Sequence, residues 1–267
     1  MTIFDFSNAY LKSQTAQFLP ELPLDQLDCY RTPHIYSWSP YFCCEVGNVS
    51  KYDVMKLFAF ILQNRFNLPN VINFEGNFAA LCTATENFDL YTLARLTPEA
   101  LTARLAEAVG CSLPSHSWEA YAEGLIDAAR YLIDLDLSYN DYITQTNENS
   151  DAVLRDICRI RGIGPALARN FLKELGVMEF GKPDVHLLEV FRAFDPTVIN
   201  EESFDRSLEV QAARAGVSPY EFDRVIWLIC TGDYFKHHLK IKCSHKTLRE
   251  NFIAALNAAI ASGSVTV

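Results

Sequence analysis

The sequence predicts a mainly α-helical protein, and three observations support this class. Apolar residues recur at three- and four-residue spacing in one segment after another from about residue 50 onward. Several of these segments begin at Ser, Thr or Pro and end at Gly, the residues that start and stop helices. The sequence shows no internal repeat and no alternation of strands with helices, so a parallel α/β sheet is not expected.

Length and composition describe a globular chain. Its 267 residues are 49% hydrophobic, which is enough to bury a core in one large or two modest domains. The sequence contains no apolar run of eighteen residues and no basic segment followed by an apolar block at its start. Neither a membrane partner nor a signal peptide is therefore expected, and we expect a cytoplasmic monomer.

The eight cysteines show neither a CxxC pair nor a regular spacing. This pattern argues against a zinc site and against a secreted disulfide framework. We expect reduced thiols and no metal site.

Residues 1–50 are the hardest part of the sequence to interpret. Four prolines interrupt the segment, and the stretch 34–44 is rich in aromatic residues with some alternation. Short strands or irregular structure are therefore expected in the stretch 34–44, within an N-terminal segment that is irregular as a whole. An aromatic cluster of this kind most often belongs to a core, and the alternative is a surface on which an extruded base stacks.

From residue 50 onward, a series of helices is expected. The apolar spacing and the flanking residues place these helices at 53–64, 97–110, 118–135, 202–216 and from Ser218 onward. The polar segment 140–150 is expected to be a loop.

A glycine hairpin joins two further expected helices. The first runs from Asp151 to Arg159, with Ser150 as its N-cap, and the second begins at Pro165 and ends before Gly176. Gly162 and Gly164 flank Ile163, so the backbone can turn tightly and approach a ligand closely. The N–H groups that open the second helix suit a phosphate, although glycine-linked helix pairs also occur as plain packing devices.

A single acid follows this hairpin at the start of another apolar helix. Asp184 lies twenty residues after Gly164, within Lys182-Pro183-Asp184-Val185-His186. An Asp before an apolar helix is by itself a normal N-cap. The combination of Arg161-Gly162-Ile163-Gly164, this spacing and the acid resembles the helix-hairpin-helix (HhH-GPD) DNA glycosylase superfamily, whose catalytic carboxylate occupies such a position.

The resemblance implies a two-domain helical fold with the active site in the cleft between the domains. Residues 51–176 would form a helical barrel ending in the helix-hairpin-helix, and residues 1–50 with 177–267 would form the second domain. The resemblance covers the organisation of residues 50–235, but its specific residues are concentrated in 158–192.

The resemblance also assigns roles to individual residues. Asp184 would be the catalytic residue. Arg161, Gly162, Ile163, Gly164 and Ala166 of the hairpin, with Lys182 and His186, would contact double-stranded DNA, and in the family the position of His186 lies near a phosphate. Asn64 or Arg65, after the helix 53–64, would fill the gap left by the flipped base, although a polar loop after a helix is common.

The net charge of −10 by itself opposes DNA binding, because affinity for nucleic acid depends on neutralising phosphates. Its distribution is uneven, however. Residues 155–182 hold six basic and three acidic side chains, and residues 236–249 hold five basic side chains, three histidines and no acid. This distribution predicts one basic face on an acidic body, and a solvated tail loop is the alternative for the second cluster.

The implied activity is hydrolysis of the N-glycosidic bond of a damaged, mismatched or modified base. Family members that also cut the strand usually carry a lysine where this chain has Ala166, so a monofunctional glycosylase is expected. Only Cys243 falls where some members hold an iron–sulfur cluster, so none is expected, whereas a monovalent cation at the hairpin carbonyls would fit the family. The alternative is a DNA-binding or lesion-sensing protein without catalysis. Either a repair role, associated with the nucleoid in a bacterium, or action on modified foreign DNA is compatible with the sequence.

Overall fold

The computed structural model confirms the mainly helical class. It describes residues 1–267 except 34, 36–48, 65–71, 111–114 and 136–137. Helices dominate the described residues, and their one sheet is a two-stranded antiparallel ribbon. The aromatic stretch 34–44 and Arg65 lie outside the described residues, apart from Ile35.

Contacts within the chain divide it into two compact units. The terminal unit comprises Met1–Pro33 and Met178–Val267, and the central unit comprises His34–Val177. The sequence placed the boundaries at 50/51 and 176/177. The two divisions differ mainly in the segment 34–50, most of which lies outside the described residues.

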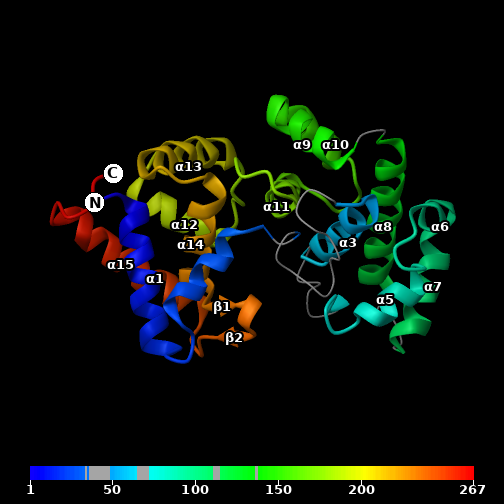
Figure 1. Ribbon diagram of the computed structural model, residues 1–267, viewed down its shortest axis with the longest axis horizontal. Helices are drawn as coiled ribbons and strands as arrows, with labels where there is room; N and C mark the ends of the chain where they lie inside the picture. Colours follow the sequence, from blue (N-terminus) through cyan, green and yellow to red (C-terminus); the bar gives the residue numbers. More distant parts are fainter. Residues whose placement is uncertain (34, 36–48, 65–71, 111–114, 136–137) are drawn as a thin grey trace. The chain divides into compact units, whose positions relative to one another are not determined.

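The terminal unit is assembled around one almost fully buried helix (Figure 1). This helix, α14, packs against each of the unit's other α-helices, α1, α12, α13 and α15. The elements of the terminal unit are α1 (Ile3–Phe18), η1 (Leu24–Arg31), α12 (Val185–Phe194), α13 (Glu201–Ala215), α14 (Pro219–Thr231), β1 (Asp233–Tyr234), η2 (Phe235–His237), β2 (Leu239–Lys240) and α15 (His245–Ala261). Ser218 caps α14 in a capping box, and Gly232 ends it with φ +61°, as expected for a Ser-Pro start and a Gly stop.

The structure corrects one expectation and one alternative for this unit. Residues 3–18 form a helix rather than part of an irregular segment, and Thr2 and Asp5 make a capping box at its start. Polar residues on the buried face of α1 hide its periodicity: Ser7 Oγ donates to the Ile3 carbonyl, and Thr15 bonds the Tyr234 hydroxyl at 2.7 Å. The second half of the basic segment 236–249 is also not a loop, since α15 begins at His245 behind the N-cap Ser244.

The central unit packs one buried helix, α3, between α8 and α11. The rings of Phe58 on α3 and Phe171 on α11 stack with centroids 3.8 Å apart. The unit contains α3 (Lys51–Leu62), α5 (Phe78–Ala84), α6 (Leu90–Arg95), α7 (Pro98–Val109), α8 (Ser115–Asp134), α9 (Tyr139–Glu148), α10 (Ser150–Ile157) and α11 (Pro165–Leu175). Thr97 and Gly110 bound α7 as the sequence predicted.

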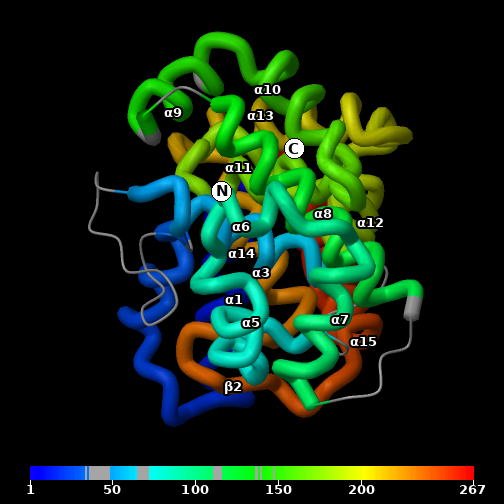
Figure 2. Tube along the Cα trace, turned by 90° about the vertical axis from the view of Figure 1, so that its right-hand side faces the viewer, coloured from blue at the N-terminus to red at the C-terminus, as the bar shows by residue number. Residues whose placement is uncertain are grey.

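The segment before the hairpin is helical, where the sequence predicted a loop. Ser138 caps α9, and Tyr142 and Thr146 form its buried stripe one turn apart. One residue, Asn149, separates α9 from α10. The two helices follow each other directly along the chain in Figures 1 and 2. Ser150 is therefore the first residue of α10 and not its N-cap, and α10 ends at Ile157, two residues earlier than expected.

No described helix has the length and apolar character needed to cross a membrane. The described cysteines, at positions 29, 82, 158, 230 and 243, are free of disulfides.

The buried hydroxyl of Tyr121 provides a test of the α3–α8 packing. It donates to the Ala59 carbonyl at 3.0 Å, and Tyr121 is 1% exposed. Tyr121→Phe should lower the free energy of unfolding by about 1 kcal/mol, because a buried hydrogen bond is lost. Urea denaturation measures this loss. Tyr91→Phe, at a position 58% exposed, is the control and should have almost no effect; equal losses for the two variants would contradict the packing.

Candidate nucleic-acid interface

The two hairpin glycines have different structural roles. Gly162 adopts φ +92°, a conformation that favours glycine, whereas Gly164 is extended at φ −94°. A Cβ at Gly164 would meet no atom within 4 Å. The fold of the free protein therefore requires glycine at position 162 but not at 164, where the open space leaves room for a ligand to approach the backbone.

Ile163 and Pro165 hold the start of α11 in place. Ile163 is 4% exposed, and its backbone N–H donates to the Ile160 carbonyl at 3.0 Å. Pro165 occupies the first position of α11, directly after Gly164. The N–H groups of Ala166 and Leu167 lie in the first turn, where no intrahelical acceptor exists, and Ala166 is half-buried. These N–H groups could bind an anion.

Two acids of α8 bind groups of Arg161 that could otherwise contact a phosphate. The Arg161 backbone N–H donates to Asp127 Oδ2 at 3.2 Å, and the Arg161 guanidinium pairs with Glu123 at 3.1 Å. The sequence assigned Arg161 to DNA contact. In the free protein its charge is instead paired within the central unit, so a phosphate would have to compete with Glu123.

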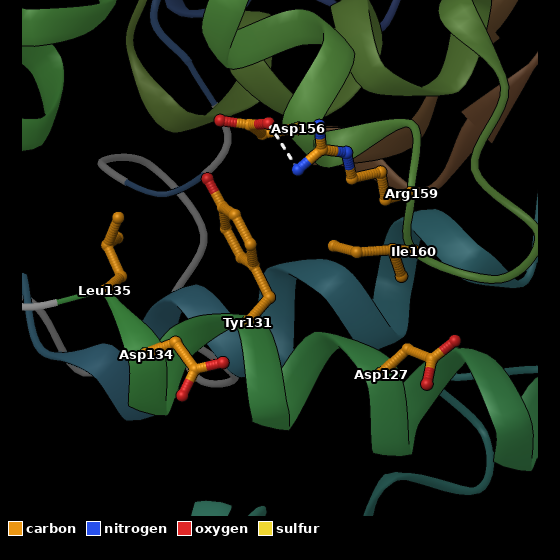
Figure 3. A pocket seen from close by; sticks show the side chains of 7 residues that line it. All are labelled: Asp127, Tyr131, Asp134, Leu135, Asp156, Arg159 and Ile160. Carbon is orange, nitrogen blue, oxygen red and sulfur yellow. Dashed lines mark ion pairs between the residues drawn. The ribbon is translucent and has the colours of Figure 1, made fainter.

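Beside the hairpin lies an acidic cavity of about 380 Å³ (Figure 3). Its walls are made by α8, α10 and the residues that follow each helix, with Asp127, Tyr131, Asp134, Leu135, Asp156, Arg159 and Ile160 as lining residues. Asp156 pairs with Arg159 at 3.2 Å, as Figure 3 shows. Of the arginines around the hairpin, Arg155 is exposed and makes no ion pair with the described residues. The positive surface here is smaller than the count of arginines suggests.

Asp184 is the N-cap of α12. Its Oδ1 accepts hydrogen bonds from the backbone N–H groups of His186, at 2.9 Å, and Leu187, at 3.1 Å. Both bonds fall on one oxygen, and Oδ2 accepts no hydrogen bond from the described residues. The carboxylate is half-buried and held in a fixed orientation with one oxygen available.

The loop before Asp184 is anchored by a buried acid on α14. Asp223, which is fully buried, accepts the Lys182 backbone N–H at 2.5 Å. A Cβ on Gly181 would lie 2.3 Å from Leu208 Cδ2 of α13, so a larger residue here would require the Leu208 side chain to move. Lys182 is half-buried. Asp223 and Gly181 therefore fix the path of the chain into Asp184.

His186 lies in the first turn of α12 and contacts α15. Its Nδ1 is 2.9 Å from Arg249 Nη1, and Arg249 Nε pairs with Glu189 at 2.6 Å. The His245 ring lies 5.5 Å from the His186 ring. Burial is the main cause that lowers the pKa of His186, and Arg249 and His245 add to this effect, against the opposing charges of Asp184 and Glu189.

The basic segment 236–249 is largely engaged within the terminal unit. Lys236 Nζ donates to the carbonyls of Cys29 and Thr32. The other paired cations are Lys240 with Asp233, Lys246 with Glu250 and Arg249 with Glu189. Lys242 is exposed and makes no ion pair with the described residues. The neutralised cations reduce the basic face that the sequence predicted for this segment.

The expected site residues fall in both units. Asn64 and the hairpin belong to the central unit, and Lys182, Asp184 and His186 belong to the terminal unit. Asn64 is half-buried, and its N–H donates to the Ile61 carbonyl at 3.0 Å. The described residues contain no group of three or more His, Cys, Asp or Glu side chains placed to hold a metal ion.

Sequence reasoning missed the acids that hold these residues. Asp127, Asp223 and Glu189 are separated by 34, 41 and 60 positions from the Arg161, Lys182 and Arg249 groups that they contact. The sequence marked Arg161, Lys182 and Arg249 as members of basic stretches, but it gave no signal for their acidic partners. No family model, no curated protein and no solved structure matches this chain.

The hairpin geometry predicts opposite behaviour for two substitutions. Gly162→Ala should lower the free energy of unfolding by about 1–2 kcal/mol, because a side chain is strained at φ +92°. Gly164→Val should leave stability within about 0.5 kcal/mol, since extended backbone and open space accept a branched side chain. Chemical denaturation measures both values.

DNA binding by the Gly164→Val variant then tests the ligand role of the hairpin. If a phosphate approaches this backbone, the variant should bind all duplexes several-fold more weakly, whatever base they carry. Fluorescence anisotropy with unmodified and lesion-bearing duplexes measures the effect. Unchanged affinity, or a loss confined to one lesion, would contradict a phosphate site at Gly164.

Proposed function

We propose that this protein is a DNA glycosylase that hydrolyses the N-glycosidic bond of a damaged, mismatched or modified base. The observation that carries the proposal is Asp184. It is a half-buried carboxylate fixed at the N-terminus of α12, twenty residues after a glycine hairpin whose second glycine faces open space. The finer architecture, a two-domain HhH-GPD fold with the reaction in the cleft between the domains, is part of this proposal.

The reaction needs a base that has left the helix. A glycosidic bond within a duplex is inaccessible, so the nucleotide rotates out at a cost of a few kcal/mol. Contacts with the phosphate backbone offset this cost. The first-turn N–H groups of Ala166 and Leu167 and the open face of Gly164 supply such contacts in the proposal. Asn64 or Arg65 would occupy the gap left in the duplex.

Asp184 would stabilise the charge that develops as the bond breaks. Positive charge builds on the sugar ring as the base departs, and a carboxylate held beside it lowers the barrier. The two N–H bonds to Oδ1 hold the carboxylate in place without reorganisation, and Oδ2 remains for the sugar or for the attacking water. Asp223 and Gly181 support this position by fixing the preceding loop.

Asp184→Asn tests this role without loss of the fold. Asparagine caps helices as well as aspartate does, so the Asn oxygen should still accept the His186 and Leu187 N–H groups and stability should change little. The variant lacks the negative charge, and excision should fall by about 100-fold or more. Single-turnover release of the base measures the rate.

The control is Asp195→Asn, which changes the acid at the opposite end of α12. Asp195 bonds Ser207 and Thr197, so this variant should alter stability more than excision. Full excision by Asp184→Asn would remove the proposed catalytic role. Loss of excision together with loss of duplex binding would instead show that Asp184 acts in DNA binding rather than in catalysis.

The product should be an intact abasic site. Position 166 carries alanine, which has no amine to attack the sugar carbon. Lys173 is on the same helix but is only 2% exposed, and Lys182 is half-buried two residues before Asp184. Water is therefore the nucleophile in the proposal.

Borohydride trapping on substrate DNA tests this expectation. No covalent protein–DNA adduct should form with the wild-type chain, because no lysine forms a Schiff base. An adduct that disappears in Lys182→Gln would show that Lys182 is the nucleophile and that the hydrolytic mechanism is wrong. Lys242→Gln, at an exposed position, is the matched control.

A further inference from the structure

The contact between Arg249 and His186 fixes the position of a proton. The guanidinium group has only donors and stays protonated in proteins, so it cannot accept a hydrogen bond. At 2.9 Å from Arg249 Nη1, His186 Nδ1 must therefore be the acceptor and carry no proton. The remaining ring proton lies on Nε2, and the imidazole is neutral.

Arg249 is itself held in place for this contact. Its Nε pairs with Glu189 Oε2 at 2.6 Å, and its side chain is only 11% exposed. Glu189 lies three residues after His186, on the same face of α12. Arg249 of α15 thus contacts two side chains of α12, and the burial of its own side chain limits its movement away from His186.

The charged groups around His186 come from both helices. Asp184 and Glu189 of α12 favour a protonated ring, whereas Arg249 and the neighbouring His245 of α15 disfavour it. Burial of the ring also disfavours the charged form and is the largest influence. Protonation at Nδ1 would place two donors 2.9 Å apart, so the hydrogen bond from Arg249 to His186 would be lost.

We infer that Arg249 is a positioning residue that holds His186 as the neutral Nε2–H tautomer. The first turn of α12 then presents one uncharged ring donor close in sequence to Asp184. This inference about the tautomer does not depend on the proposed function. Its consequence for DNA rests on that function: His186 contacts a phosphate oxygen as a neutral donor, and the contact persists above the lowered pKa of the ring.

Nitrogen NMR of the histidine rings tests the tautomer directly. Two-bond proton–nitrogen correlation spectra of the whole protein at neutral pH should show His186 with an unprotonated Nδ1 and a protonated Nε2. In Arg249→Met, Nδ1 should become partly protonated and the ring should titrate at higher pH, because Asp184 and Glu189 remain while the cation is lost. Arg249→Gln retains an amide donor, so a larger fraction of His186 should remain in the Nε2–H form than in Arg249→Met.

Lys246→Met is the matched control on α15, because Lys246 is exposed and pairs with Glu250. It should leave the His186 spectrum unchanged. A protonated Nδ1 in the wild-type protein would overturn the inference. So would an Arg249→Met spectrum identical to that of the wild type.

A separate measurement tests the consequence for DNA. Between about pH 8 and pH 5, Arg249→Met should gain affinity for a plain duplex relative to the wild type, since its His186 becomes cationic. Adding His186→Gln should remove that gain. If the tautomer is as inferred but the two pH profiles run parallel, His186 does not contact phosphate. That result would count against the proposed DNA contact and leave the positioning role of Arg249 intact.

Discussion

The structure around Asp184 depends on one interaction, the N-cap of α12. One carboxylate oxygen accepts two backbone N–H groups, which begins the helix and fixes the side chain in the same step. Because Oδ1 alone makes these bonds, the cap leaves Oδ2 for chemistry. An N-cap and a catalytic acid are therefore compatible roles for Asp184. Two neighbouring contacts help to hold Asp184 in position. The Lys182 backbone N–H donates to Asp223, and Leu208 packs closely against Gly181.

More of the positive charges around both parts of the candidate site are paired than the sequence suggests. Glu123 and Asp156 pair with the arginines near the hairpin, and Lys236 bonds two backbone carbonyls. The free protein thus presents few unpaired cations there, with Arg155 and Lys242 exposed and without ion pairs in the described part of the chain. On a chain of net charge −10, affinity for a duplex would then depend more on backbone N–H groups and ordered side chains than on bulk charge.

The sequence predicted those features that depend on local rules. Helix α7 runs between Thr97-Pro98 and Gly110, and α14 begins after Ser218, because caps act on adjacent residues. The α1 helix was missed because Ser7 and Thr15 satisfy their hydroxyls on the buried face and so break the apolar pattern. The contacts of Asp127, Asp223 and Arg249 depend on packing between distant segments, which no local pattern encodes.

Release of a free base is the most direct measure of the central claim. The wild-type protein is incubated with duplexes that each carry one damaged, mismatched or modified base, and the products are separated by chromatography. The account predicts that at least one duplex loses its base and retains an uncut strand with an abasic site. Tight and selective binding to one of these duplexes with no base released from any of them would contradict it.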